Sequence, residues 1–196
     1  DYKDDYYVEE TKYHDQLCNV KRAAQALSLN DTRGSVFTPS ILTDDYLVQD
    51  CKQVNPSAIA HEVWFFGAHS DVGGGALNTN ISGVSLNWMI DQIREYELLP
   101  KDAEVYENGL DVTNDPRQGF MKVIFPKKGR KLVFFTSRAG YKKEKLKIHQ
   151  SVLDRLEGSL QTYEINLIKM FGECFEKNDQ GGYDYLESSD CFTIEY

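Results

Sequence analysis

The stretch WFFGAHSDVGGGA, residues 64–76, carries the residue types best suited to chemistry in this chain. An apolar run leads to His69, and behind it come Asp71 and then Gly73, Gly74 and Gly75. An imidazole can accept and return a proton near neutral pH. Consecutive glycines let the backbone turn tightly and can present N–H groups to an anion. The stretch predicts either a catalytic histidine at a strand end or a packed histidine on a turn, and spacing alone leaves both open.

Three familiar ligand-binding patterns do not fit this glycine loop. In a dinucleotide fingerprint starting at Gly73, the third glycine would fall on Asn78. A phosphate-binding loop requires a lysine after the glycines, and none follows. His69 and Asp71 point the same way on an extended segment, but two ligands are too few for a metal site. We therefore expect no metal and no cofactor.

A hydrolase histidine fits the stretch better. In α/β-hydrolases the chain order is nucleophile, acid, histidine, and the histidine lies on a loop after a late strand. There it takes the proton of a serine and later returns it to the leaving group. Asp71 could orient a catalytic group, cap the following helix, or order the glycine loop through backbone hydrogen bonds. We favour a structural role for Asp71, as a cap or as a residue that orders the loop, over a catalytic one.

The neighbouring segments predict an α/β fold. Residues 61–68 form a short apolar run without alternation, which is typical of a strand buried on both faces. Residues 82–100 place apolar side chains at helical spacing, with Ser82 or Ser85 as a cap and Pro100 beyond the end. Strand, glycine loop and helix form the unit of a mostly parallel sheet flanked by helices, whose ligand crevice lies at the carboxyl ends of the strands.

Further helices are predicted on either side of this unit. We expect a helix over residues 18–30, with the Asn-Asp pair at its end as the stop. A second helix is predicted over 149–160, with Ser151 as its cap. The segment from residue 161 begins helically and ends in an acidic, aromatic tail.

Composition limits the classes of function. The chain has 196 residues, 41% of them hydrophobic, which suits one globular domain. Its formal net charge of −9 argues against nucleic-acid binding, because that function needs a basic face. No run of about 18 apolar residues is present, so no transmembrane segment is expected. The four cysteines show no C-x-x-C spacing, which argues against a zinc site and for reduced thiols in a cytosolic compartment.

A family resemblance begins with residues 63–90, VWFFGAHSDVGGGALNTNISGVSLNWMI. They resemble the α/β-hydrolase domain of type VI secretion phospholipase effectors, the Tle-one-like catalytic domain. That family carries a W-F-x-G-x-H-x-D-V-G-G-G strand and loop, followed by a helix with W-M. Two further segments resemble the same family in order, VKRAAQALSLNDTRGSVFTPSIL (20–42) and LKIHQSVLDRL (146–156). Together the matches cover roughly residues 18–165.

The chain departs from that family in one important respect. The family has a G-x-S-x-G nucleophile elbow before these segments and a catalytic acid on a later strand end, and we find neither upstream here. Ser85 lies in GVSLN, which lacks the second glycine, and Ser70 is next to the histidine and cannot also meet it productively. The resemblance therefore implies the C-terminal half of an α/β-hydrolase domain.

Three regions are expected on this basis. Residues 1–17 form an acidic tail or connecting segment that begins with DYKDD, either native or the remnant of an epitope tag. Residues 18–165 form the C-terminal half of the hydrolase domain, and residues 166–196 form a C-terminal extension. An α/β sheet that is cut between strands leaves an unpaired edge, so we expect the two halves to stay associated.

The resemblance implies part of a serine ester hydrolase, a lipase of phospholipase type that serves as a secreted toxin. His69 would be its general base, and the loop of Gly73, Gly74 and Gly75 would face substrate or an anion. The nucleophile and the acid would lie on an N-terminal half, from the same gene or a separate chain. The other expected partners are a phospholipid or another ester and a secretion or immunity protein. Such an effector is cytoplasmic before export and acts at a membrane afterwards.

A non-catalytic role is the alternative. Because no nucleophile is found, the chain could be a degenerate hydrolase module that binds a protein or a membrane. Two basic clusters, at 126–131 and 141–147, could contact anionic lipid, although such clusters are more often a solvated face.

Overall fold

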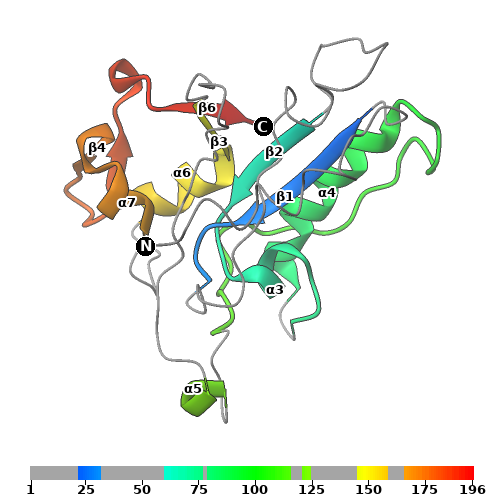
Figure 1. Ribbon diagram of the computed structural model, residues 1–196, viewed down its shortest axis with the longest axis horizontal. Coiled ribbons are helices and arrows are strands. Elements are labelled where there is room, and N and C mark those ends of the chain that lie inside the picture. The colour runs from blue at the N-terminus through cyan, green and yellow to red at the C-terminus, as the bar shows by residue number, and fades with distance from the viewer. Residues whose placement is uncertain (1–21, 32–59, 77–78, 116–120, 125–144, 159–165) are drawn as a thin grey trace, which may run out of the picture. The chain divides into compact units, whose positions relative to one another are not determined.

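A computed structural model describes residues 22–31, 60–76, 79–115, 121–124, 145–158 and 166–196 (Figure 1). The chain forms two compact units, one made of residues 1–25, 40–62 and 133–144 and the other of residues 26–39, 63–132 and 145–196. In the first unit only residues 22–25 and 60–62 are described, and there a guanidinium nitrogen of Arg22 lies 3.3 Å from Nδ1 of His61. The second unit holds the remaining described residues, among them His69 and the glycine loop.

A mostly parallel four-stranded sheet has the order β1-β2-β3-β6. Its strands are β1 (Ala23–Ser28), β2 (Ala60–Phe65), β3 (Leu146–His149) and β6 (Phe192–Glu195). β3 pairs in parallel with both of its neighbours, with Trp64 of β2 opposite Ile148. Helices follow β2 and β3 along the chain (Figure 1). This arrangement confirms the α/β class at the level of a mostly parallel sheet with flanking helices.

The helix expected over 18–30 is wrong for the part that the structure describes, because β1 occupies residues 23–28. Residues 23–26 are half-buried, and Leu27, Ser28 and Leu29 are all at least 95% buried, so neither face of the strand is fully exposed. Its apolar residues therefore show no alternation, and short buried strands of this kind cannot be told from helices by period alone. Pairing with β2 decides the conformation, and it continues past β1 in the hydrogen bond from Leu29 N–H to the Phe65 carbonyl.

The strand expected over 61–68 is confirmed as β2. Val63, Trp64 and Phe65 are at most 3% exposed, as a central strand covered on both faces requires. The Phe65 ring packs edge-on against Trp88, with 5.5 Å between centroids, and stacks on the ring of His149 at 4.8 Å. β2 therefore contributes both to the core and to the support of the segment after β3.

The two main helices confirm the predicted helical segments. A single turn, α3 (His69–Val72), follows β2 directly, and α4 (Asn80–Arg94) comes after the glycine loop. α6 (Gln150–Glu157) follows β3, and α5 (Met121–Ile124) is another single turn. Each long helix thus starts near the carboxyl end of a strand, which is the course expected of a parallel α/β sheet.

The predicted caps are wrong. The residue before α4 is Thr79, and its side chain makes no capping hydrogen bond. Ser85 instead lies inside α4, where its hydroxyl contacts the Ser82 carbonyl at 3.1 Å and the Val72 carbonyl of α3 at 2.6 Å. The cap of α6 is His149, whose Nδ1 accepts from the backbone N–H of Ser151. Serines one turn inside a helix bond backward to carbonyls, which sequence spacing does not distinguish from capping.

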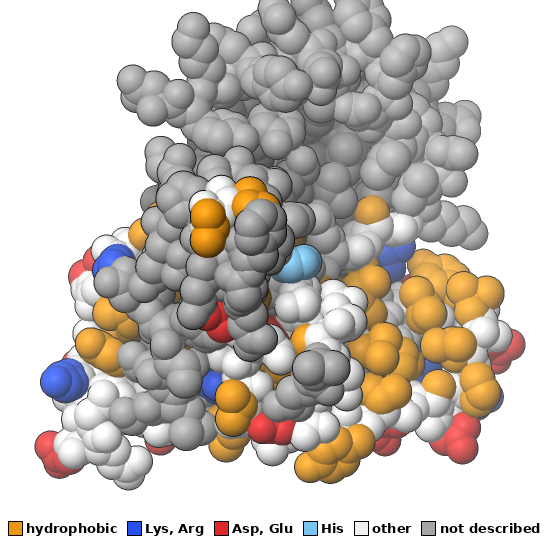
Figure 2. Space-filling view, turned by 90° about the horizontal axis from the view of Figure 1, so that it is seen from below, with side chains coloured by type: hydrophobic (Ala, Val, Ile, Leu, Met, Phe, Trp, Pro, Cys, Tyr) orange, Lys and Arg blue, Asp and Glu red, His pale blue; other side chains and the backbone are white. Residues whose placement is uncertain are grey.

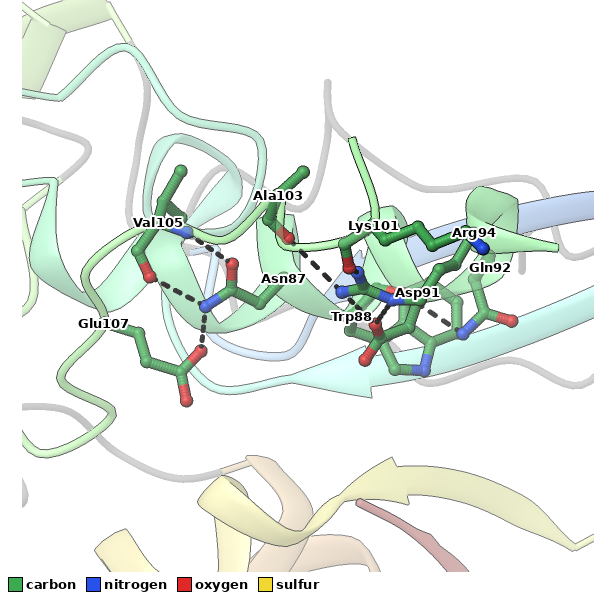
Figure 3. Close-up of polar contacts among 9 residues, drawn as sticks. All are labelled: Asn87, Trp88, Asp91, Gln92, Arg94, Lys101, Ala103, Val105 and Glu107. Carbon is green, nitrogen blue, oxygen red and sulfur yellow. Dashed lines mark hydrogen bonds and ion pairs between the residues drawn. The ribbon is translucent and has the colours of Figure 1, made fainter. Parts of the chain in front are cut away.

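The segment that returns from α4 is tied to that helix (Figure 3). The Asn87 amide accepts from the Val105 N–H and donates to the Val105 carbonyl, each at 2.9 Å. Arg94 donates to the carbonyls of Lys101 and Ala103. Large apolar side chains are exposed here, among them Leu98 at 69%, and Figure 2 shows hydrophobic side chains gathered on one side of the face that it draws.

The C-terminal residues form structure rather than the expected tail. α7 (Asn166–Met170) is followed by an antiparallel hairpin of β4 (Phe175–Lys177) and β5 (Tyr183–Tyr185), and β6 then joins the main sheet beside β3. Short 3-10 turns, η1 (Gly172–Cys174) and η2 (Glu187–Ser189), link these pieces. A disulfide joins Cys174 to Cys191, which corrects the expectation of reduced thiols for this pair. Widely spaced cysteines give no indication of their pairing until the fold brings them together.

Candidate active site

His69 makes a close contact with a buried carboxylate. Its Nδ1 lies 2.8 Å from Oδ2 of Asp31, and the backbone N–H of His69 donates to the same oxygen at 3.3 Å. The Asp31 side chain is fully buried, whereas the His69 side chain is 43% exposed. The pair therefore consists of one group held inside the protein and one that reaches the surface.

The chemistry of Asp31 assigns the proton on the ring. An ionised carboxylate can only accept hydrogen bonds, and two N–H donors converging on one oxygen favour that ionised form. Nδ1 of His69 therefore carries the hydrogen in the neutral ring, which makes Nε2 the nitrogen able to take a proton. An imidazole oriented in this way has the acid–base polarity of a catalytic histidine.

Neighbouring strands position the two residues. β1 ends at Ser28 and β2 ends at Phe65, and Asp31 and His69 follow these ends. The hydrogen bond from Asn30 N–H to the Gly67 carbonyl, 2.9 Å, keeps the two outgoing segments together. Polar residues that follow adjacent strands meet at the carboxyl edge of the sheet, where α/β proteins place their ligands.

Both carboxylate oxygens of Asp71 accept hydrogen bonds. It is 1% exposed, and Oδ2 accepts from the Ala68 N–H at 2.9 Å. Oδ1 accepts from the backbone N–H of Asn114 at 3.0 Å and from its side-chain amide at 2.6 Å. The described bonds of Asp71 thus tie the start of α3 to the segment around residue 114.

A buried guanidinium, that of Arg155, lies close enough to Asp71 to feel its charge. Arg155 of α6 is 2% exposed, and its guanidinium carbon lies 4.6 Å from the centre of the Phe66 ring. Nη1 donates to the carbonyls of Gly109 and Asp111, each at 2.6 Å. Burial lowers the pKa of Arg155, and the negative charges of Asp71 and Asp111 oppose this shift. Arg155 lies in the segment 146–156 that resembles the family, but sequence analysis assigned it no role.

The glycine loop follows α3 and is partly open to solvent. Gly73 N–H donates to the His69 carbonyl at 2.7 Å. Gly74 and Gly75 have positive φ angles of 81° and 88°, a conformation that other residues rarely adopt. Among the residues that the structure describes, no group of three metal-ligating side chains is present.

His149 occupies a comparable place at the end of the next strand, but with different partners. Its Nδ1 lies 2.9 Å from the Ser151 hydroxyl and accepts from the Ser151 N–H at 3.3 Å. Burial lowers the pKa of His149, while the charges of Glu107, Asp154 and Glu195 act in the opposite direction. His149 therefore caps α6 and packs against the Phe65 ring.

Asp31 is the partner of His69, and sequence analysis did not identify it as such. It stands in the segment that resembles the family, but it was interpreted as the stop of a helix. A signal was present, because ALSLND resembles WFFGAHSD in ending an apolar run with polar residues. Interpreted as a strand end, this segment would have placed Asp31 at the same sheet edge as His69.

The fold and the site define an α/β domain with a carboxylate-bound histidine at the carboxyl edge of its sheet. Residues 3–92 match the family model described as T6SS, Phospholipase effector Tle1-like, catalytic domain. The family resemblance is thereby confirmed over those residues, and the segment at 146–156 lies beyond them. Searches of curated proteins and of solved structures found no match.

The described helices were also compared with the requirements of a membrane span. None of them is both long enough and apolar enough to cross a bilayer. This finding concerns only the part of the chain that the structure describes.

Proposed function

We propose that His69 is the general base of a serine ester hydrolase acting on phospholipid, and that Asp31 is the acid that orients it. The contact of 2.8 Å between Nδ1 of His69 and Oδ2 of Asp31 carries this proposal. Support comes also from the family match, whose description names a phospholipase effector. The acid thus lies in this chain, whereas sequence analysis placed it elsewhere.

The reaction uses the polarity of this pair. Nε2 of His69 takes the proton of a serine hydroxyl while the hydroxyl oxygen attacks the ester carbonyl carbon. The tetrahedral intermediate collapses, and the imidazolium returns the proton to the departing alcohol oxygen. A water then repeats the sequence on the acyl-enzyme and releases the fatty acid and the serine. Asp31 stabilises the imidazolium in both halves without becoming protonated.

The serine comes from polypeptide outside these 196 residues, which contain no G-x-S-x-G. An N-terminal half from the same gene, or a separate chain, would place it opposite Nε2 of His69. Export, action at a membrane and binding to a secretion or immunity protein belong to the same proposal. The family description, a secretion-system effector, supports them.

The loop residues have supporting roles in this scheme. Asp71 orders the loop, because its oxygens bond to Ala68 and Asn114. Gly73, Gly74 and Gly75 lie directly after α3, and the loop that they form would face the substrate phosphate or the developing oxyanion. The Gly73 N–H is bonded to the His69 carbonyl, so Gly74 and Gly75 would supply the N–H groups. The positive φ angles of Gly74 and Gly75 favour glycine at both positions. Because glycine has no side chain, nothing at these positions would block such an approach.

The test is His69→Ala in protein that includes the polypeptide supplying the serine. We expect hydrolysis of a phospholipid to be lost while far-UV circular dichroism stays unchanged, because His69 is partly exposed and contributes little to the core. His149→Ala is the matched control, since it removes a histidine from the neighbouring strand end and should leave hydrolysis nearly intact. Full activity of the His69 variant would contradict the proposal.

A binding module is the second candidate, and the absence of a G-x-S-x-G segment favours it. Intact-mass analysis of the native preparation separates the two functions. A co-purifying or covalently continuous segment with a nucleophile elbow supports the hydrolase. A folded, monodisperse chain without such a segment supports the module.

A further inference from the structure

The peptide group of Gly67 is held from three directions. Its carbonyl accepts from the backbone N–H of Asn30 at 2.9 Å and from the Ser28 hydroxyl at 2.8 Å. Its N–H donates to Oδ1 of Asn30 at 3.0 Å. Gly67 lies between β2 and α3 with φ +114°, so the direction of the chain toward His69 depends on this residue.

We propose that Asn30 is a positioning residue that sets the hydrogen bond between His69 and Asp31. The inference rests on the proposed function of that pair. Asn30 directly precedes Asp31, and Gly67 lies two residues before His69. The bond from Gly67 N–H to Oδ1 of Asn30 is therefore the link that the Asn30 side chain adds to the backbone bonds between the two segments that carry the pair. Productive catalytic geometry tolerates displacements of only about 0.5 Å, so such a link controls the rate.

The choice of an amide at this position supports the inference. Asn30 is 5% exposed, and among the described residues its Nδ2 has no hydrogen-bond partner. A buried, unpaired donor is unfavourable, so the side chain must be present for its acceptor oxygen. A carboxylate would accept from Gly67 equally well. It would also place a second negative charge beside buried Asp31 and weaken the ionisation that the histidine requires.

A remote asparagine provides a matched control. Asn87 also joins two backbone segments, because its amide accepts from the N–H of Val105 and donates to its carbonyl. This link lies between α4 and its returning segment, and Asn87 makes no described contact with His69 or Asp31 (Figure 3). Asn87→Ala should therefore disturb local structure without affecting the pair.

The first measurement needs no activity. In nitrogen-15-labelled chain, NMR of the His69 ring reports the tautomer and the hydrogen-bonded Nδ1 proton. We expect Asn30→Ala to shift that proton signal upfield or abolish it and to populate the Nε2–H tautomer. Asn87→Ala should leave the signal unchanged. An unchanged His69 signal in folded Asn30→Ala would overturn the positioning role, whatever the outcome for His69→Ala.

The second measurement uses the assembled hydrolase. Asn30→Ala should lower kcat by about 10²-fold with little change in KM, the effect of a displacement of about 1 Å at the reacting groups. If Asn30→Ala loses the NMR signal while His69→Ala keeps full activity, the positioning role stands and the proposed function fails. The two ideas can thus fail separately.

Asn30→Asp keeps the inference testable if the alanine variant does not fold. It retains the acceptor for Gly67 N–H, so the Nδ1 proton signal should persist at alkaline pH. The added charge should move the acidic limb of the pH–rate profile to higher pH. A folded Asn30→Asp variant with the wild-type profile, or without the alkaline signal, would overturn the inference.

Discussion

Two histidines lie at or just beyond the ends of adjacent parallel strands, and their surroundings give them opposite properties. His69 comes after β2 and begins α3, whereas His149 ends β3 and caps α6. Nδ1 of His69 faces the carboxylate of Asp31, whereas Nδ1 of His149 accepts the N–H of Ser151. The first ring must therefore carry its hydrogen on Nδ1, and the second ring on Nε2.

Burial adds to this difference. The His149 ring stacks on Phe65, and desolvation lowers its pKa, so it favours the neutral form. His69 is 43% exposed and has a fully buried anion behind it, an arrangement that stabilises an imidazolium as it forms. Comparison of the two sites teaches that a position at the sheet edge does not by itself decide which ring nitrogen of a histidine carries the hydrogen. The partner of Nδ1 decides it.

The largest expected effect comes from replacing the hydrogen-bond acceptor that faces Nδ1 of His69 with a group that can donate. Asp31→Asn turns the acceptor into an amide that can donate to Nδ1, which stabilises the wrong tautomer. We expect kcat of the assembled hydrolase to fall by about 10⁴-fold, as for the equivalent change in a serine protease triad. Steady-state kinetics checks this, with Ser151→Ala as the control at the other histidine. If kcat of Asp31→Asn fell by less than tenfold, the contact with Asp31 would not distinguish His69 from His149 in function.

The next effect concerns the backbone that carries His69. A Cβ at Gly67 would lie 2.5 Å from Cβ of Asp71, and its φ of +114° disfavours any other residue. We expect Gly67→Ala to lower the free energy of unfolding by about 4 kcal/mol, from strain and overpacking together. Chemical denaturation measures it, and Gly172→Ala, where a Cβ would meet nothing within 4 Å, is the control. Equal costs at both glycines would contradict the close approach.

A smaller effect is expected at the second histidine. His149→Ala removes the cap of α6 and the stacking on Phe65, which together stabilise the fold by about 1–2 kcal/mol. His149→Asn keeps a capping acceptor and should recover part of this loss. Urea denaturation of the two variants should give a lower free energy of unfolding for His149→Ala than for His149→Asn. Hydrolysis should be nearly unchanged in both, so a large loss of activity in either would remove the contrast with His69.

The smallest effect is a pH dependence of stability. The pKa of His149 in the folded protein lies below the ordinary 6.5, so the unfolded chain binds the proton more readily. Its contribution is therefore complete above the ordinary pKa and is lost as the pH falls through the folded value. Unfolding free energies of the wild type and of His149→Asn, measured on both sides of that range, should converge at the acidic end. Parallel curves would assign the pH dependence to other groups.

The sequence predicted some elements well and others wrongly, for identifiable reasons. β2, α4 and α6 are confirmed, because their apolar runs or helical periods are clear. β1 was predicted as a helix, since a short strand without a fully exposed face shows no period of two. The acidic C-terminal segment was predicted as a tail, but Phe192–Glu195 pairs with β3. Strand pairing across long sequence separations leaves no local signal.

By itself, the sequence determined that His69 follows a buried strand, that a glycine loop comes after it, and that this stretch resembles a phospholipase effector family. Only the tertiary structure decided which carboxylate meets the ring. Asp71 is nearer in sequence, but its oxygens bond to Ala68 and Asn114, whereas Asp31 arrives from the adjacent strand. The physical reason is that side chains at the edge of a parallel sheet are neighbours in space through strand order, which spacing along the chain does not encode.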